Sequence, residues 1–563
     1  MPFVPQSPPP RLTEASAIAA VLASEKIADW VARYPAEGLV EDATRDEDTD
    51  LWTVKIWSEG KAGQIVLAKV EDDTSRVVEA WTGPQVAWTM ARGSKGSFGR
   101  KINDTTIWLV FCSAFLLGLA DLRRPISVRN LDLLVLLSFS VSLWFFNKGE
   151  IFTSVPLAYP PLLYLLARMA WIGRRGGGSR VRAVWPVWAL AAATVFLAGF
   201  KVGLNVQASN VIDVGLASVA GAQRIAGDGQ APYGNMPTDA GEPCGPANSD
   251  GYIRDHVQTN GRCEAQITRG DTYGPVTYLA YVPGFVAFGW SGKWDQTAGE
   301  SWGNLPAAHF TSILFDLLAI AGLFLAGRRF GGVRLGVTLA FAWAAYPFTQ
   351  YVSSSNSNDA IMPALLVWGF VLVTSGVARG LFAGLAAWAK FAAFLLVPLW
   401  ASYPSRLSRP RGTAAYAGGL VLACALSLWV LLLEPDPVHA ARVLWDRTLG
   451  FQLSRGSPFS IWDWGQYGYV DLSLVQRALE IVLVLAALAL AFVPRTRTPI
   501  RLAALTAALL IGFELVLTHW FYLYIPWFFP FVALALLAPE PARPKPAESP
   551  PRNSEVKALV ASW

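Results

Sequence analysis

Charge is the property that this sequence has least of. Only 15% of its 563 residues are Asp, Glu, Lys or Arg, against about 25% in an average soluble protein. Hydrophobic residues make up 53%, and 24 residues are tryptophan. This composition argues against a soluble globular protein and predicts a mainly α-helical, polytopic membrane protein with tryptophans at the membrane interface. The net charge of +5 comes largely from short arginine clusters, which are typical of cytoplasmic anchors and not of a nucleic-acid surface.

The sequence also lacks an apolar N-terminal segment, and it has few cysteines. The opening MPFVPQSPPPRLTEAS has no apolar core, so we expect no signal peptide. Of four cysteines, Cys112 and Cys424 lie in apolar runs and are expected to be small core residues. Cys244 and Cys263 share a long polar stretch without a His/Cys cluster of zinc spacing. We expect them to form a disulfide in an oxidising compartment, the alternative being a reduced or metal-binding pair.

Residues 1–104 differ from everything after them. A helix is expected over 12–33, followed by three strands with alternating β-branched and aromatic residues. The strands are predicted at 51–57, 63–70 and 75–82. We therefore predict a small soluble α+β domain, joined to the membrane part by a segment, 82–103, whose glycines favour a flexible hinge.

The strand–turn–strand stretch VEDDTSRVVEAW in this domain resembles a PepSY-like module. The resemblance implies a role in binding or regulation instead of catalysis. A solubilising cap is the alternative.

After residue 104 the chain consists mainly of apolar runs, and a membrane-spanning helix needs about 20 such residues. The runs cover 105–121, 131–147, 155–172, 183–204, 306–327, 334–351, 360–377, 381–403, 412–433, 473–493, 500–518 and 520–538. We therefore expect about twelve spans. The first three, in 105–182, precede a core of 183–538, and the proline-rich, charged tail 539–563 is expected to be disordered.

Short basic loops predict the orientation, because such loops usually remain in the cytoplasm. Five of them join the spans: 121–129, 174–182, 327–334, 405–411 and 494–501. This orientation places the loops 205–305, 353–359 and 434–472 on the extracytoplasmic side of a cell membrane. It also places residues 1–104 there, although basic residues precede the first span.

Two apolar segments do not fit a simple crossing under this orientation. Residues 381–403 must enter and leave on the same side, and Gly384, Lys390 and Pro398 favour a broken or re-entrant helix pair. The stretch 273–290 would reverse the later loops if it spanned, and its prolines argue against a regular spanning helix. We expect an interfacial helix there.

The polar stretch 205–305 is the longest interruption of the apolar pattern. Asp213 follows a span by a few residues and precedes a helix of small residues, a PYG sequence and the surface helix TYGPVTYLAYVPG. In these features residues 183–538 resemble the GT-C superfamily of polyprenyl-phosphate-sugar-dependent glycosyltransferases, closest to its bacterial mannosyltransferase-like families. Further likenesses are GRRFG, Gly-Leu-Ala at 384–386 with Lys390, SPFS at 457–460, and HWFYLYIPWFFPF. The chain departs from the family in its three extra spans and in Gly274-Pro275, which replaces Pro-Pro.

The resemblance implies an integral membrane glycosyltransferase of the cell envelope, which passes a sugar from a polyprenyl-phosphate donor to an extracytoplasmic glycan or lipid acceptor. Asp213 matches the family's acidic residue, and a carboxylate there can act as general base. A helix N-cap or an interfacial charge is the alternative. Asp271 is a second acid, a metal ligand or, slightly favoured, the cap of the surface helix. A divalent cation would be held by Asp213 with Asp271 or Asp359, since some family members use a cation and others none.

A phosphate leaving group needs cationic or hydrogen-bonding stabilisation, and sugars stack on aromatic rings. The candidates for substrate binding are Arg224, Arg254, Arg269, Tyr273, Lys390, Arg455, His519 and Tyr522. Packing at the membrane interface is the alternative for the aromatic and histidine residues.

Three ionisable residues, Asp316, Lys390 and Glu514, lie inside apolar runs and are costly in a bilayer. They either act on a substrate or form structural ion pairs, with one another or with Lys201. They motivate an alternative function, a transporter or flippase for a lipid-linked or anionic substrate. A third alternative is a non-catalytic membrane sensor or scaffold.

Overall fold

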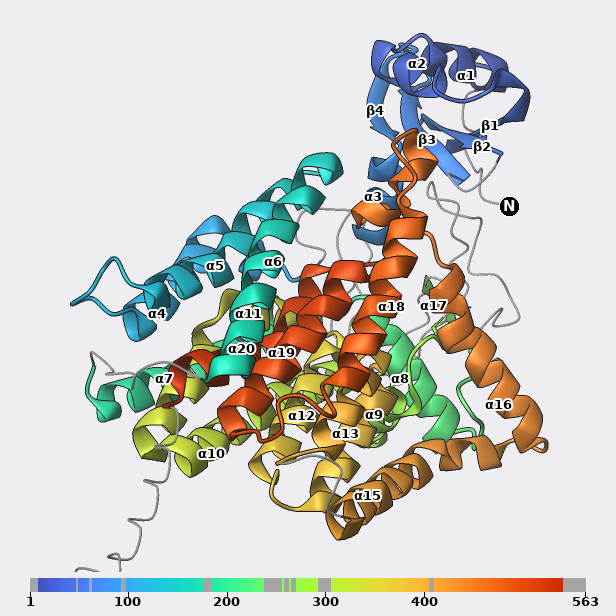
Figure 1. Ribbon diagram of the computed structural model, residues 1–563. Coiled ribbons are helices and arrows are strands. Elements are labelled where there is room, and N and C mark those ends of the chain that lie inside the picture. Colours follow the sequence, from blue (N-terminus) through green and yellow to red (C-terminus); the bar gives the residue numbers. More distant parts are fainter. Residues whose placement is uncertain are drawn as a thin grey trace, which may run out of the picture.

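A computed structural model gives the fold of the chain (Figure 1). It describes residues 9–46, 49–59, 63–92, 98–176, 185–236, 256–257, 263–264, 270–291, 305–404 and 410–539. As predicted, the protein is mainly helical, and a small antiparallel sheet is confined to the N-terminal part. The sheet and its helices stand at one end of a large helical body.

The N-terminal domain is a four-stranded antiparallel meander with helices packed on it. Its elements are α1 (Glu14–Leu22), α2 (Glu25–Val31), β1 (Leu39–Asp46), β2 (Leu51–Ser58), β3 (Gly63–Glu71), β4 (Val77–Thr82) and α3 (Pro84–Arg92). The three predicted strands are confirmed. The single helix predicted over 12–33 is instead two helices, because the chain turns at Ser24, which occupies the N-cap of α2. β1 was not predicted, because its sequence, LVEDATRD, is charged, as is common for edge strands.

The helical body contains seventeen α-helices among the described residues, thirteen in the main bundle and four in the longer connections. The helices of the bundle are α4 (Thr105–Leu119), α5 (Val128–Phe146), α6 (Ile151–Arg175), α7 (Val187–Ala208), α10 (Pro306–Ala345), α11 (Pro347–Ser355), α12 (Ile361–Val371), α13 (Gly376–Ala389), α14 (Val397–Ala401), α15 (Pro410–Leu428), α18 (Ser473–Ala489), α19 (Pro499–Val516) and α20 (Ile525–Leu537). The loops between them contain α8 (Asp213–Ala226), α9 (Pro275–Phe288), α16 (Pro437–Trp445) and α17 (Phe451–Ser454).

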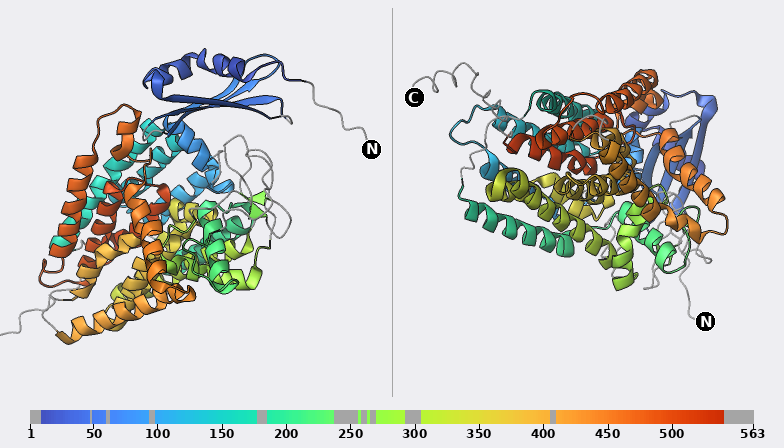
Figure 2. Two further views of the ribbon diagram at one scale, coloured as in Figure 1. Left: turned by 90° about the vertical axis from the view of Figure 1, so that its right-hand side faces the viewer. Right: turned by 60° about the horizontal axis from the view of Figure 1, so that its bottom comes forward.

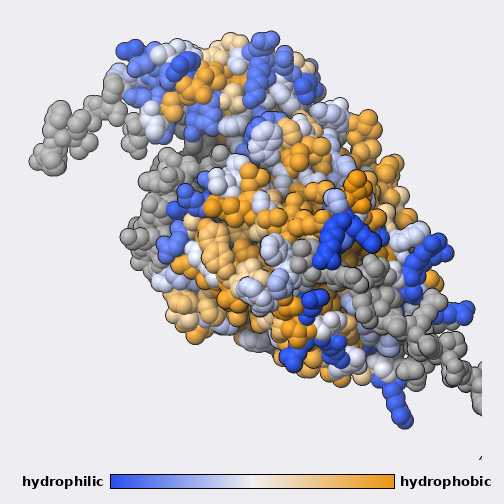
Figure 3. All heavy atoms as spheres, turned by 90° about the vertical axis from the view of Figure 1, so that its left-hand side faces the viewer, coloured by the Kyte–Doolittle hydropathy of each residue, from blue (hydrophilic) through white to orange (hydrophobic). Residues whose placement is uncertain are grey.

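Six of these helices are long and apolar enough to cross a membrane: α5, α6, α7, α10, α19, and α15 with the turn that follows it. Others, among them α4, α12, α13 and α20, are apolar but shorter. One face of the molecule shows an apolar band below the more hydrophilic N-terminal domain (Figure 3). Length, composition and surface are therefore those expected of a helical membrane protein.

Helix α10 is in fact two helices joined by a tight turn. Gly332 has φ of +84°, outside the helical region, and the chain reverses around it. A Cβ on Gly327 would lie 2.6 Å from Cα of Gly336, so the two halves pack backbone to backbone. The predicted pair of helices flanking the basic loop 327–334 is thus confirmed.

The segment that was expected to enter and leave on the same side does double back. Lys390 is extended (φ −137°, ψ 120°) and ends α13. A 3-10 helix (Phe391–Leu396) and α14 follow. The Arg379 Nε, in the first turn of α13, donates to the carbonyl oxygen of Trp400 at 2.8 Å. The broken helix pair is confirmed, and Lys390 lies at its tip.

The polar sequence SSSNSND (353–359) was expected to be an external loop. Instead, its residues are all buried. Residues up to Ser355 belong to α11, and Asn358–Ala360 form a 3-10 turn before α12. Polar composition misled the prediction, because several of these side chains, among them Ser355, Asn356 and Asp359, are hydrogen-bonded inside the helical body.

Described residues in or next to three of the predicted basic loops, 174–182, 405–411 and 494–501, lie together at one end of the helical body. Arg497 Nη1 donates to the Ser402 carbonyl at 2.8 Å, and Arg501 Nη2 donates to the Arg175 carbonyl at 3.1 Å. These contacts join the regions around residues 175, 402 and 497.

The N-terminal domain docks at the other end (Figures 1 and 2). The Tyr34 hydroxyl donates to the carbonyl oxygen of Gln466 at 3.3 Å. Gln85 Nε2 donates to the carbonyl oxygen of Gly149 at 3.3 Å. The domain therefore contacts the α5–α6 connection and the loop 434–472.

Gly274, the N-cap of α9, provides a test of this packing. A Cβ at this position would overlap the carbonyl oxygen of Trp388 in α13. We expect Gly274→Ala to lower the free energy of unfolding by about 1–3 kcal/mol through overpacking, measured as a lower midpoint in thermal unfolding of the purified protein. Gly203→Ala in α7, where the added methyl meets open space, is the matched control. Equal midpoints for the two variants would contradict the contact.

Candidate functional site

Two interruptions of helical structure bring Asp359 and Lys390 together. Asp359 lies in the 3-10 turn before α12, and Lys390 follows the last residue of α13. Lys390 Nζ is 3.0 Å from Asp359 Oδ1, and both residues are buried. A buried charge without a partner costs several kcal/mol. Each of these residues therefore offsets part of the cost of burying the other's charge, and we call them the central ion pair.

Aromatic rings enclose the central ion pair. Lys390 Nζ lies 4.7 Å from the centre of the Tyr273 ring and 5.6 Å from that of Trp527, within the range of cation–π attraction. Trp527 Nε1 also donates to Asp359 Oδ1 at 3.2 Å. The Tyr524 ring stacks on Trp527 with 4.2 Å between ring centres. The ammonium group is thus fixed by one carboxylate and two rings.

Asp213 lies next to this cluster and remains exposed. It is the first residue of α8, and Ile212 occupies the N-cap position, so the alternative that Asp213 caps the helix is wrong. None of the described residues forms a hydrogen bond or ion pair with its carboxylate. Burial raises the pKa of Tyr273, and the charges of Asp213 and Asp359 raise it further. Both carboxylates therefore lie near the same tyrosine hydroxyl.

Asp271 has a different role from the one predicted. Gly274, and not Asp271, is the N-cap of α9, so the cap assignment was wrong. The buried Asp271 Oδ2 accepts from the Gly234 amide at 2.8 Å and lies 3.4 Å from Arg447 Nε. Burial raises the pKa of Asp271, against the opposing effects of Gly234 and Arg447. The residue links the loop after α8 to the segment after α16.

The remaining predicted substrate-binding residues that the structure describes are engaged elsewhere. Arg224 pairs with Asp228 at 2.8 Å, and Arg455 lies 5.5 Å from the centre of the Phe451 ring. His519 Nδ1 is 2.9 Å from Ser457 Oγ. The Tyr522 hydroxyl is hydrogen-bonded to Ser142 at 2.6 Å and to Ser154 at 3.2 Å. Of the predicted binding residues, only Tyr273 and Lys390 therefore contact the central ion pair or belong to it.

Several predicted residues fall outside the described ranges. They are Arg254, Arg269 and Cys244, together with the side chain of Cys263. The predicted disulfide is therefore not among the described features. Cys112 and Cys424 are free and partly buried.

The described residues contain no group of three His, Cys, Asp or Glu side chains arranged to hold a metal ion. The predicted pairing of Asp213 with Asp359 or Asp271 on a cation meets competition, because Lys390 already neutralises Asp359 and Arg447 lies beside Asp271. These two basic side chains occupy the electrostatic position that a cation would take.

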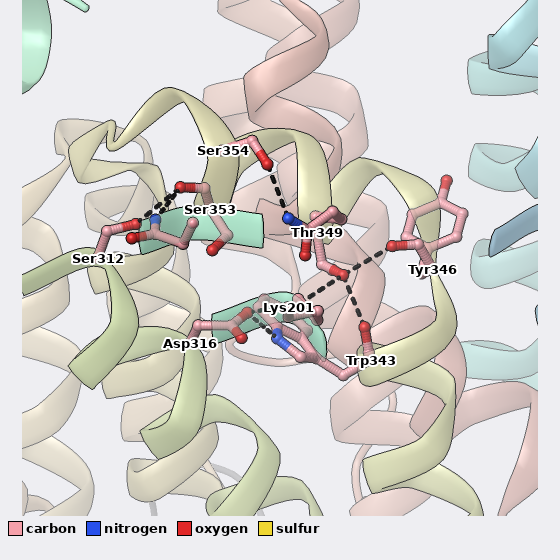
Figure 4. Close-up of polar contacts among 10 residues, drawn as sticks. Lys201, Ser312, Asp316, Trp343, Tyr346, Thr349, Ser353 and Ser354 are labelled. Carbon is pink, nitrogen blue, oxygen red and sulfur yellow. Dashed lines mark hydrogen bonds and ion pairs between the residues drawn. The ribbon is translucent and has the colours of Figure 1, made fainter. Parts of the chain in front are cut away.

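A second ion pair lies deeper in the helical body (Figure 4). Lys201 Nζ of α7 donates to Asp316 Oδ1 of α10 at 2.7 Å and to Thr349 Oγ1 of α11 at 3.2 Å. Trp343 Nε1 donates to the same Asp316 oxygen at 2.8 Å. This is the interhelical pairing of Asp316 with Lys201 that the sequence left as one alternative. Glu514 instead accepts from Trp520 Nε1 at 3.0 Å.

An asparagine network, not found from the sequence, holds the segment that carries Asp213. Asn356 adopts the left-handed conformation (φ 50°, ψ 34°), which asparagine tolerates better than most residues. Its Nδ2 donates to the Asn210 carbonyl at 2.7 Å, and its Oδ1 accepts from Asn205 Nδ2 at 2.8 Å. The amide of Ile212 donates to the Ser355 carbonyl at 3.2 Å. Asn356 in SSSNSND is the residue from which the sequence could have indicated this network.

No family model, curated protein or solved structure matches the chain. The residues of the site themselves therefore define the chemistry that it can perform. These are an exposed carboxylate, Asp213, and a cation, Lys390, held by Asp359 between the rings of Tyr273 and Trp527.

Removal of one partner of the central ion pair should destabilise the protein more than removal of both. We expect Lys390→Met to cost about 3–5 kcal/mol, because it leaves the Asp359 carboxylate buried without its cation. The double variant Lys390→Met/Asp359→Asn should regain part of this loss. Thermal unfolding of the single and double variants checks the coupling, with Lys148→Met at an exposed lysine as control. Purely additive effects would contradict the ion pair.

The raised pKa of Asp271 predicts a pH dependence of stability. A carboxyl whose pKa is higher in the folded state stabilises the fold below its unfolded pKa, and this contribution is lost as pH rises through the folded value. Since Asp271 has an ordinary value of 3.8, the wild type should lose stability relative to Asp271→Asn as pH rises above about 4. Thermal unfolding from pH 4 to pH 8 measures the difference. A difference independent of pH, or as small as for the exposed Asp29→Asn, would refute it.

Proposed function

We propose that this protein is an integral membrane glycosyltransferase with about twelve membrane segments. It transfers a sugar from a polyprenyl-phosphate donor to a glycan or lipid acceptor on the extracytoplasmic side. The observation that carries the proposal is that two charges act on Tyr273: the ammonium group of Lys390 lies over its ring, and the exposed carboxylate of Asp213 acts electrostatically on its hydroxyl. Glycosyl transfer needs these two charges, a base for the acceptor and a positive group for the leaving phosphate.

In the proposed step Asp213 takes the proton from an acceptor hydroxyl. The acceptor oxygen forms a bond to the anomeric carbon of the sugar, and the bond from that carbon to the phosphate oxygen breaks. The electron pair leaves with polyprenyl phosphate, whose charge Lys390 stabilises. The aromatic rings of Tyr273, Tyr524 and Trp527 offer apolar faces near the reacting groups, and sugar rings stack well on such faces.

The position of the site supports a substrate that arrives through the membrane. α12, α13 and α20 have 11, 14 and 13 residues, and a full crossing takes about 20. Asp359, Lys390 and Trp527 lie at or near the ends of these three helices. Because these helices end before a full crossing, the site lies inside the helical body near one of its ends. A lipid-linked phosphate can reach it there. We place this end outside, because three of the basic loops lie at the other end.

Asp213→Asn should abolish transfer while leaving the protein folded. The assay is the release of polyprenyl phosphate from radiolabelled undecaprenyl-phosphate-linked hexoses and pentoses by the purified protein in nanodiscs, with membrane glycolipids as acceptors. Loss of the general base should reduce turnover by about 10²–10⁴-fold. Asp228→Asn, at an exposed carboxylate just beyond the same helix, is the matched control.

Wild-type turnover in Asp213→Asn would overturn the role of Asp213. Movement of an intact donor across the membrane, without release of its sugar, would support the alternative of a transporter or flippase. Mass spectrometry of the lipid products distinguishes these outcomes.

A further inference from the structure

A short linker joins the N-terminal domain to α4, and its described part, residues 98–103, packs against the segments that lead to the candidate site. We propose that Phe98, Gly99 and Arg100 are positioning residues, which hold the two segments that carry Asp213 and Asp359. The inference rests on the proposed function for its catalytic consequence. Of the flexible hinge predicted over 82–103, residues 84–92 form α3 and Phe98 and Gly99 are buried, while residues 93–97 lie outside the described ranges.

Gly99 brings the linker against the backbone of α11. Its φ of +110° is a conformation that other residues rarely adopt. A Cβ at Gly99 would lie 2.6 Å from Ser354 Cβ and 2.9 Å from the Ser354 carbonyl oxygen. The contact is therefore possible only for glycine. Ser354 belongs to the buried polar segment 353–359 and lies five residues before Asp359.

Phe98 fixes the linker between two parts of the site. Its ring stacks on Tyr351 of α11 with 5.6 Å between centres and an interplanar angle of 18°. It also lies 6.2 Å from the Phe521 ring. Phe521 precedes the turn that carries Tyr524, the ring stacked on Trp527. Phe98 thus contacts α11, which precedes Asp359, and the segment that precedes Tyr524 and Trp527.

Arg100 reaches the other segment. Its Nε donates to Asn210 Oδ1 at 3.0 Å, and the Asn210 amide donates to the Ser354 carbonyl at 2.9 Å. Asn210 lies three residues before Asp213. One linker therefore holds both the Asp213 segment and the Asp359 segment, and sets their separation.

The linker is itself anchored, so it can transmit this restraint. Ile102 is fully buried, and Asn147 Nδ2 at the end of α5 donates to Asn103 Oδ1 at 3.2 Å. Asn103 Nδ2 in turn donates to the Gly99 carbonyl. These bonds fix the linker independently of the contacts that dock the N-terminal domain, such as Tyr34 with Gln466.

The test uses the full chain in nanodiscs, with undecaprenyl-phosphate-mannose and -glucose as donors. Arg100→Ala and Phe98→Ala should each lower kcat about tenfold while the donor KM stays within about twofold, because the carboxylates are displaced but the donor contacts remain. Arg100→Lys and Phe98→Tyr, which keep the hydrogen-bond donor and the ring, should restore kcat. Tyr34→Phe, which loosens only the domain contact, is the matched control and should retain wild-type kcat.

Hydrogen–deuterium exchange provides the second measurement. In Arg100→Ala and Phe98→Ala, exchange should rise in 205–215 and 350–360 and stay unchanged in α19. Wild-type exchange in both segments, or failure of Arg100→Lys to restore what Arg100→Ala loses, would overturn the proposal. Arg100 is exposed, so its variants decide the matter if Phe98→Ala does not fold. If the wild type turns over neither donor, the proposed function fails, and exchange alone decides whether the linker holds the two segments.

Discussion

The structure depends on a single constraint, the cost of placing charge inside an apolar body. Charge is scarce in this sequence, and four of the charged residues that the helical body buries form two ion pairs, Lys390 with Asp359 and Lys201 with Asp316. Each pair is completed by a tryptophan N–H that donates to the carboxylate. The second pair joins three helices with every contact internal to the protein. The first lies at helix ends beside an exposed carboxylate, so the same physical solution serves stability in one place and is available for chemistry in the other.

Interrupted helices need the same kind of compensation. Backbone groups freed at a break must find partners when water is absent, and here the partners are side chains of serine and asparagine. Asn356 accepts the left-handed conformation at the break and bonds Asn205 and the Asn210 carbonyl. The buried polar segment 353–359 therefore has a structural reason to be rich in serine and asparagine. Its polarity is what places Asp359 and the start of α8 next to each other.

Much of this architecture follows from local sequence patterns, and the errors have one cause. Helix type, the three strands, the turn at the basic loop 327–334 and the break at Lys390 are all visible as periodicity, glycine or charge within a few residues. The burial of 353–359 and the true partners of Asp271, Arg224 and Tyr522 depend on segments far apart in the chain. A polar run has the same composition whether water or other side chains satisfy it. For Asp213, position in the sequence suggested a site, and only the fold shows that Tyr273 and Lys390 lie near it.

The docking of the N-terminal domain also bears on how the chain is made. Tyr34 contacts a residue 432 positions further along, and ribosomes add about 5–20 residues per second. The domain therefore exists for roughly 20 s or longer before Gln466, one part of its docking surface, has been synthesised. During this time it depends on its own core, in which α1 and α2 bury Ala17, Val21 and Ile27 against the sheet. Assembly is thus ordered in time. The N-terminal domain can fold early, but its docking is complete only when the segment around Gln466 has been added.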